Sequence, residues 1–246
     1  MKTFRFGKHA PKLDYRTLKF KNYVTSELAA PPASFDVLAT IYKKLKITGP
    51  AQLFPMDGND QYGDCTIAAL AHAMTVYNGL IGKKKIWDVK SVTKLYLHLT
   101  GGADTGLNEL DVLNYWQSNP VDGEKIFAYT AIDVKNHTHI KQAIELFGGV
   151  YLGLQVQQNC IQEFDAHKPW VPAPLTNDGH AVYAVSYDAA GVTVLTWGST
   201  QKATWAWWNE CVDEAYAILP AEASKTDFAP GFDFAQLKAD LSDVAH

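Results

Sequence analysis

The spacing of apolar residues predicts helices in the first half of the chain. After a turn-forming stretch at 55–63, apolar side chains recur over 65–78 at the three- and four-residue intervals of a helix. A buried helix is therefore expected to begin almost at Cys65. Two more helices are expected over 107–116 and 139–147, because apolar residues again share one face there.

The second half of the chain changes to the pattern of β-strands. The segments 150–156, 181–187 and 192–197 are rich in β-branched and aromatic residues, and 188–191 has the composition of a hairpin turn. A closing strand is expected at 215–219. Helices followed by strands indicate an α+β fold.

The division of the chain follows from its proline-rich and polar stretches. Residues 1–31 are basic, aromatic and irregular, which is typical of an extended arm lying on a domain. Residues 32–222 are expected to form one domain, with a helical part over about 32–130 and a β part over about 131–222. Residues 223–246 read as a polar C-terminal tail.

Composition and charge narrow the classes of function. The 246 residues are 47% hydrophobic and 20% charged, which is ordinary for a globular protein and excludes a disordered chain or a coiled coil. The net charge is −4, and the arginines are Arg5 and Arg16 alone, so a nucleic-acid partner is not expected. No signal-peptide pattern and no apolar run of about 18 residues occurs, so we expect a cytoplasmic protein that does not engage a membrane.

The three cysteines raise the question of a nucleophile. Cys65, Cys160 and Cys211 are odd in number and far apart, which fits neither a disulfide framework nor a zinc cluster. Nothing else in the sequence indicates a metal or an organic cofactor. The start of a helix favours a thiolate, so Cys65 has the position of an activated thiol. Gly63 would allow a substrate backbone to approach. The alternative is that Cys65 is simply a small buried residue.

A thiolate needs a general base, and the candidates are eight histidines. His180 opens the strand at 181–187, so a rigid sheet would hold its imidazole. His72 lies seven residues after Cys65, about 10 Å along the same helix, which is too far for proton exchange. A purely structural role for His180 is the alternative.

These residues together resemble the papain-like cysteine peptidases. The segment Pro55-Met-Asp-Gly-Asn-Asp-Gln-Tyr-Gly-Asp-Cys65 is similar to their nucleophile loop, and the strand that begins at His180 is similar to the strand that carries their base. The strand 192–197, followed by Gly198, resembles the next one. The resemblance spans about 32–219 and implies a divergent, prokaryotic- or phage-type member. The implied fold is a helical half packed against an antiparallel sheet or barrel, with a cleft between them.

Three departures from the family pattern concern the site itself. The family's oxyanion-donating glutamine is replaced by Asn59, while Gln61 lies two residues nearer to the cysteine. The orienting asparagine is also missing. Counting back from the pair Trp197-Gly198 puts the position of that asparagine at Leu195. Strand alternation instead favours Thr196, whose hydroxyl can accept a hydrogen bond from the histidine. The disulfide cysteine of the secreted enzymes is absent, which agrees with a reducing compartment.

The resemblance implies a cysteine-dependent hydrolase of a peptide or other amide bond. Cys65 would attack, His180 would act as the base, Thr196 would orient His180, and Asn59 or Gln61 would bind the oxyanion. The alternatives are a papain-like amidase or acyltransferase, or a weak or inactive domain that serves for binding. We expect selective alkylation of Cys65 at about pH 6 to 7. About 30 residues are short for an inhibitory propeptide, so an arm packed on the domain and no zymogen are expected.

Overall fold

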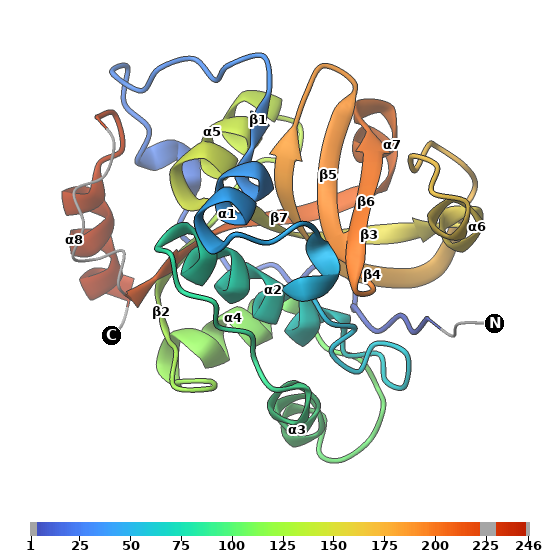
Figure 1. The fold of residues 1–246 in the computed structure, drawn as a ribbon. Helices are drawn as coiled ribbons and strands as arrows, with labels where there is room; N and C mark the ends of the chain where they lie inside the picture. Colours follow the sequence, from blue (N-terminus) through green and yellow to red (C-terminus); the bar gives the residue numbers. More distant parts are fainter. Residues whose placement is uncertain (1–3, 222–229, 245–246) are drawn as a thin grey trace.

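The computed structural model describes residues 4–221 and 230–244. Figure 1 shows the helices α2, α3 and α4 grouped on one side of the molecule and the strands β4, β5 and β6 on the other. The described helices are α1 Val37–Leu45, α2 Cys65–Leu80, α3 Val89–Leu99, α4 Glu109–Ser118, α5 His137–Phe147, α6 Cys160–Asp165, α7 Trp205–Cys211 and α8 Phe234–Val244. Short 3-10 turns occur at Phe20–Asn22 and Pro50–Gln52.

One sheet unites the strands of the described chain. Its strands are β1 Phe35–Asp36, β2 Ile126–Ala131, β3 Val150–Gln157, β4 Leu175–Tyr187, β5 Gly191–Thr196, β6 Ser199–Thr204 and β7 Val212–Pro220. Their order is β2-β7-β3-β4-β5-β6, with β1 paired to β4, and all neighbours are antiparallel. The α+β class, with helices against an antiparallel sheet, is confirmed. The expected helical and β parts overlap in the chain, because β2 lies before residue 131 and α5 after it.

Helix α2 forms the centre of the core. Every residue of α2 except Tyr77 and Leu80 is buried, and the helix packs against β4 as well as against α1. Small side chains permit this close packing. A Cβ atom added at Gly79 would lie only 2.6 Å from the side chain of Ile41. The helix that begins at Cys65 is therefore packed against other elements on all sides. This packing fixes the position of its first residue.

The pairing of β4 with β5 brings Thr196 to the face that carries His180. Tyr183 pairs with Leu195. Side chains alternate along a strand, so Thr196, one residue beyond Leu195, shares a face with His180, three residues before Tyr183. This is the register that the alternation of the sequence favours.

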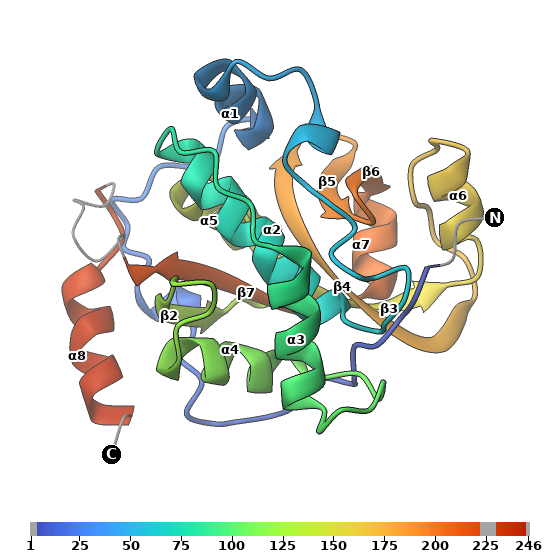
Figure 2. The ribbon, with the colours of Figure 1, turned by 60° about the horizontal axis from the view of Figure 1, so that its bottom comes forward.

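The segment 4–31 is an arm that crosses the domain. Figure 2 shows it in blue, running past the start of α2 and then beneath α4. Its middle part is anchored: Phe20 and Tyr23 are fully buried, and the hydroxyl of Tyr23 donates to Asp240 on α8 over 2.8 Å. Of the expected tail, residues 222–229 and 245–246 lie outside the described residues. None of the described helices is both long enough and apolar enough to cross a membrane.

Candidate active site

Cys65 and His180 line the same small cavity. Cys65 is the first residue of α2, and His180 lies within β4, where the structure buries both side chains. Asn59, Thr196 and Trp197 contribute to the same lining. The cavity measures about 10 Å³, which is about the space that one water molecule needs. The candidate residues are thus assembled around a site that has no room for a substrate.

The ring of His180 is fixed on two sides. Its Nε2 atom lies 2.8 Å from the Oγ1 atom of Thr196. The indole of Trp197 stacks on the imidazole with 4.9 Å between ring centroids. Nδ1 has no hydrogen-bond partner among the residues that the structure describes. Burial lowers the pKa of His180 to about 3, so the imidazole is neutral in this state.

Burial also governs the thiol of Cys65. It raises the pKa of Cys65 to about 12, although backbone hydrogen bonds from Ala181 and Gly7 act in the opposite direction. Cys160 and Cys211 have pKa values raised to about 12 for the same reason. Burial in this covered state therefore opposes the ionised thiol that the helix start led us to expect. Exclusion of water outweighs the favourable position at the helix end.

The two candidates for the oxyanion donor have different surroundings. The Nδ2 atom of Asn59 donates to the carbonyl oxygens of Arg5 and Tyr62 over 3.1 and 3.2 Å, and it lies 3.3 Å from a carboxylate oxygen of Asp64. Asn59 is buried at the cavity, whereas Gln61 is exposed and does not line it. The structure therefore brings Asn59, and not Gln61, to Cys65.

Residues 4–9 of the arm lie against the segments that carry Cys65 and His180. A Cβ atom on Gly7 would lie 1.9 Å from the carbonyl oxygen of Gly63, two residues before Cys65, so the two backbones are in direct contact. Gly106 has a positive φ of 79°, and a Cβ atom there would lie 2.3 Å from the carbonyl oxygen of Gly7. Only residues without a side chain allow the arm to pass this closely.

Backbone hydrogen bonds hold the arm in the groove. The N–H of Arg5 donates to the carbonyl of Asn59 over 2.9 Å, and that of Lys8 donates to Gly179 over 3.1 Å. Leu107 pairs with the arm twice, donating to Gly7 over 2.8 Å and accepting from His9 over 2.9 Å. This is the pattern of a strand added to the edges of a cleft.

Aromatic side chains of the arm close the site above His180. Phe4 stacks on Trp197 at 4.5 Å between centroids, and Phe6 contacts the ring of His180 edge-on at 5.6 Å. We expected an arm packed on the domain but did not place it beside Cys65. The available signal was the alternation of Phe4, Phe6 and Lys8 with Arg5 and Gly7, because alternate residues of an extended segment face the same side.

His72 has a separate role. Its Nε2 atom lies 3.0 Å from the carbonyl oxygen of Pro55 and 3.1 Å from a carboxylate oxygen of the buried Asp57. These contacts tie α2 to the loop that precedes it. His72 reaches the cavity wall, but its Nε2 atom is directed to the loop.

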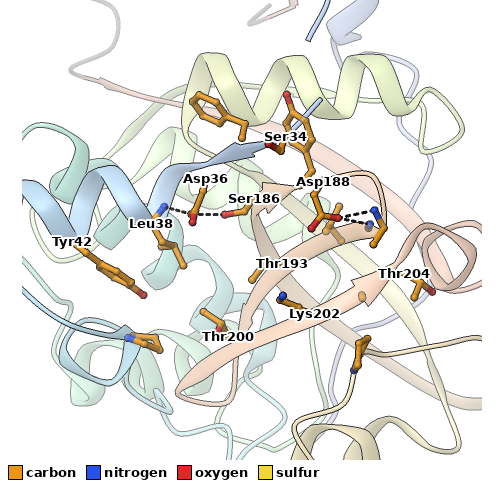
Figure 3. Close-up of a pocket in the computed structure, with 18 residues that line it drawn as sticks. Ser34, Asp36, Leu38, Tyr42, Ser186, Asp188, Thr193, Thr200, Lys202 and Thr204 are labelled. Atoms are coloured by element: carbon orange, nitrogen blue, oxygen red, sulfur yellow. Dashed lines mark hydrogen bonds between the residues drawn. The ribbon is translucent and has the colours of Figure 1, made fainter. Parts of the chain in front are cut away.

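The larger surface pocket of the domain lies elsewhere. It has a volume of about 620 Å³ and is formed by β1, α1 and the strands β4, β5 and β6 (Figure 3). Asp36 accepts there from the hydroxyl of Ser186 over 2.9 Å, and it also caps α1. Neither Cys65 nor His180 lines this pocket. Pocket size therefore does not identify the candidate site.

Comparison with solved structures shows which known fold the chain shares. No family model and no curated protein matches the chain. Among solved structures, xylellain, a cysteine protease from Xylella fastidiosa, is similar with a TM-score of 0.65 at 16% identity, over 89% of this chain and 97% of that one. A procathepsin B from Trypanosoma congolense is similar with a TM-score of 0.58 at 11% identity, over 88% and 86%. A Carica candamarcensis cysteine protease gives 0.54 at 14% identity, over 76% and 98%.

The chain therefore has the fold of the papain-like cysteine peptidases. Helices precede an antiparallel sheet, and the first residue of the buried helix meets the strand that carries His180.

Proposed function

We propose that the protein is a cysteine-dependent hydrolase of peptide or other amide bonds, and that residues 4–9 hold it in a latent state. The observation that carries the proposal is the line of three side chains at one cavity: Cys65, then His180, then Thr196 2.8 Å from the far ring nitrogen. A buried histidine with one nitrogen engaged and the other unpaired is suited to exchange a proton with a thiol.

The reaction begins when the arm leaves its position beside Cys65 and His180 and water or substrate reaches these two residues. Renewed solvation lowers the pKa of Cys65 and raises that of His180, which reverses the effects of burial. The thiol proton passes to Nδ1 of His180, and the thiolate attacks the substrate carbonyl. The imidazolium then protonates the departing amine, which leaves an acyl group on Cys65. Water, deprotonated by His180, releases the acid and restores the thiol.

Two further groups serve the intermediate. Asn59 has three acceptors around its amide nitrogen and loses one of them, the carbonyl of Arg5, when the arm leaves; the oxyanion takes this place and accepts from Asn59 together with the backbone N–H of Cys65. Thr196 accepts from Nε2 of His180 and keeps Nδ1 toward the thiol. The threonine hydroxyl thus takes the histidine-orienting role that the resemblance assigns to an asparagine.

The test displaces the arm without touching these residues. Gly7→Val places a branched side chain where a single Cβ already meets Gly63, while Gly49→Val is the matched control, since a Cβ at Gly49 meets nothing within 4 Å. Alkylation by iodoacetamide at pH 7, followed by mass spectrometry, is expected to be about tenfold faster or more at Cys65 in Gly7→Val and unchanged in Gly49→Val. Hydrolysis of a panel of fluorogenic peptide amides should rise in parallel and disappear in Gly7→Val/Cys65→Ala.

The second candidate function is binding by an inactive domain. The filled cavity is the observation that favours it, because the described state has no open cleft above Cys65. Rapid alkylation of Cys65 in Gly7→Val with no hydrolysis of any amide in the panel would favour this alternative. Unchanged alkylation in a Gly7→Val protein whose near-UV circular dichroism is that of a folded chain would contradict both the covering role of the arm and the activated thiol.

A further inference from the structure

The side chain of Lys8 is buried among carboxyl groups. Its Nζ atom lies 2.8 Å from Oδ1 of Asp213 and 3.1 Å from Oε1 of Glu214, and only 1% of the side chain is exposed. Lysine is rarely buried to this degree unless its charge is matched. Tyr216 donates to the other oxygen of Glu214 over 2.8 Å and holds that carboxylate in place.

A third carboxyl group faces the same lysine without a hydrogen bond. Glu109, at the start of α4, is fully buried, and neither of its carboxylate oxygens has a hydrogen-bond partner in the described part of the chain. Burial raises the pKa of Glu109, Glu214 raises it further, and Lys8 lowers it. For Lys8, burial acts to lower the pKa, but Glu109, Glu214 and Asp213 outweigh it and raise the value. Three carboxyl groups thus share one cation.

The space that Lys8 occupies is shaped for a long, unbranched side chain. A Cβ atom at Gly153 on β3 would lie 1.9 Å from the Cε atom of Lys8. The lysine stem therefore runs over a position of the sheet where any other residue would block it. A Cβ atom there would also lie 2.9 Å from Cγ of Glu214, so an alanine at this position would meet both the lysine stem and one of the pocket carboxyl side chains.

This acidic recess is next to the reacting position. Lys8 directly follows Gly7, whose backbone hydrogen-bonds to the thiol of Cys65. The N–H of Lys8 also pairs with Gly179, the residue before His180. A peptide that replaced the arm along the same edges would thus direct a side chain into the recess when a neighbouring residue lay over Cys65.

We propose that Glu109, Asp213 and Glu214, with Gly153 between them, form a specificity pocket for a lysine or arginine side chain of the substrate, which Lys8 fills in the latent state. The assignment rests on the proposed hydrolase function. Departure of Lys8 leaves buried carboxyl groups without a cation, and an unpaired buried charge is strongly unfavourable. A substrate with a basic residue at this position restores the charge pairing. A neutral residue leaves the carboxyl groups without a cation, and an acidic residue adds charge repulsion.

The experiment uses the full chain with Gly7→Val to displace the arm while Lys8 and the pocket stay chemically intact. A positional library of fluorogenic peptide amides varies each residue near the scissile bond. We expect lysine and arginine to exceed leucine in kcat/KM by about tenfold or more at one position, and glutamate to be the poorest there. Two second-site variants change the pocket: Glu214→Gln removes a charge, and Gly153→Ala fills space beside the Lys8 stem and Cγ of Glu214. Each is expected to reduce the preference for lysine and arginine over leucine in kcat/KM by about fivefold or more.

A readout that needs no catalysis keeps this test separate from that of the proposed function. A fluorescent peptide with the sequence of residues 4–12 should bind Gly7→Val protein, and the same peptide with glutamine in place of Lys8 should bind about tenfold more weakly or worse. Loss of hydrolysis with this binding preference intact would overturn the hydrolase and retain the basic-side-chain pocket. Equal binding of the two peptides, or a basic preference that Glu214→Gln and Gly153→Ala both leave unchanged, would overturn the pocket.

Discussion

The Oγ1 atom of Thr196 lies 2.8 Å from Nε2 of His180, which is a hydrogen-bond distance. The other ring nitrogen, Nδ1, has no hydrogen-bond partner in the described part of the chain. A hydroxyl in this place can accept from the imidazole, but it lacks the rigid plane of an amide. The ring is instead clamped by Trp197, whose indole stacks on it. The bond and the stack together fix the ring so that Nδ1 is the nitrogen left unpaired.

The first prediction concerns this bond. Thr196→Val keeps the shape and removes the acceptor, so kcat of the arm-displaced enzyme should fall about 3- to 30-fold, as the loss of one hydrogen bond implies. Thr196→Asn is expected to restore the rate and the acidic limb of the pH–rate profile, which a merely structural residue would not move. An unchanged rate in Thr196→Val would show that another group orients His180.

A matched pair of amides tests the oxyanion donor. Asn59 is buried at the cavity and Gln61 is exposed, so Asn59→Ala should reduce kcat of the Gly7→Val enzyme by about 100-fold or more, with KM changed far less. Gln61→Ala should leave both constants close to those of the parent. Thermal unfolding of each variant controls for loss of the hydrogen bond to Asp64. A larger effect at Gln61 would mean that the loop rearranges when the arm leaves.

Stability should depend on pH through Asp64. Burial raises the pKa of Asp64 to about 8, against the opposing hydrogen bond from Asn59. The folded state therefore holds this proton more tightly than the unfolded chain, whose aspartates titrate near pH 4. The stabilisation is fully present below about pH 4 and is lost as the pH rises through about 8.

The measurement compares Asp64→Asn with the parent. Asparagine keeps the shape and cannot ionise, so the midpoint of thermal unfolding should fall less between pH 5 and pH 8.5 in the variant than in the parent. Glu109 and Glu214 titrate in both proteins and cancel from the difference. Parallel midpoint curves for the two proteins would show that Asp64 is ionised throughout.

Docking of the arm should depend on one lysine and not on its neighbour. The side chain of Lys8 is 1% exposed, whereas that of Lys12 is 56% exposed in its pair with Asp111. Lys8→Met should speed exchange of the Leu107 amide hydrogen, which donates to the carbonyl of Gly7, by about 10- to 100-fold. Lys12→Met should change it less than about threefold, since exposed pairs contribute little. Similar exchange rates in both variants would refute the anchoring role of Lys8.

Local patterns sufficed for the parts of the site that lie within single elements. Helical spacing placed Cys65 at the start of α2, and strand alternation put Thr196 on the face of His180. The strand β6, Ser199–Thr204, was missed because its polar sequence carries no apolar alternation. Helix α3 was not delimited either, since charged and polar residues interrupt its narrow apolar face.

Contacts between distant segments were beyond the reach of those patterns. The approach of Gly7 to Gly63 depends on backbone shape at two places far apart in the chain, and glycine has no side chain to signal it. The cluster around Lys8 joins the arm, α4 and β7, and each of its acids alone resembles an ordinary surface residue in the sequence. The reactivity of Cys65 could not be inferred for the same reason, because it depends on what covers the thiol.

The anchoring of Phe20 and Tyr23 makes the covering segment an intramolecular competitor. These residues stay buried against the core and α8 when residues 4–9 lift away, so the released segment remains tethered close to the cleft. A short tether gives an effective concentration of about millimolar, which a free substrate has to exceed or outbind. In the proposed latent state, apparent KM is then multiplied by the ratio of all molecules to open molecules, while kcat at saturation is untouched. Under the proposed function, the arm would thereby set the substrate affinity that is needed for turnover at a given substrate concentration.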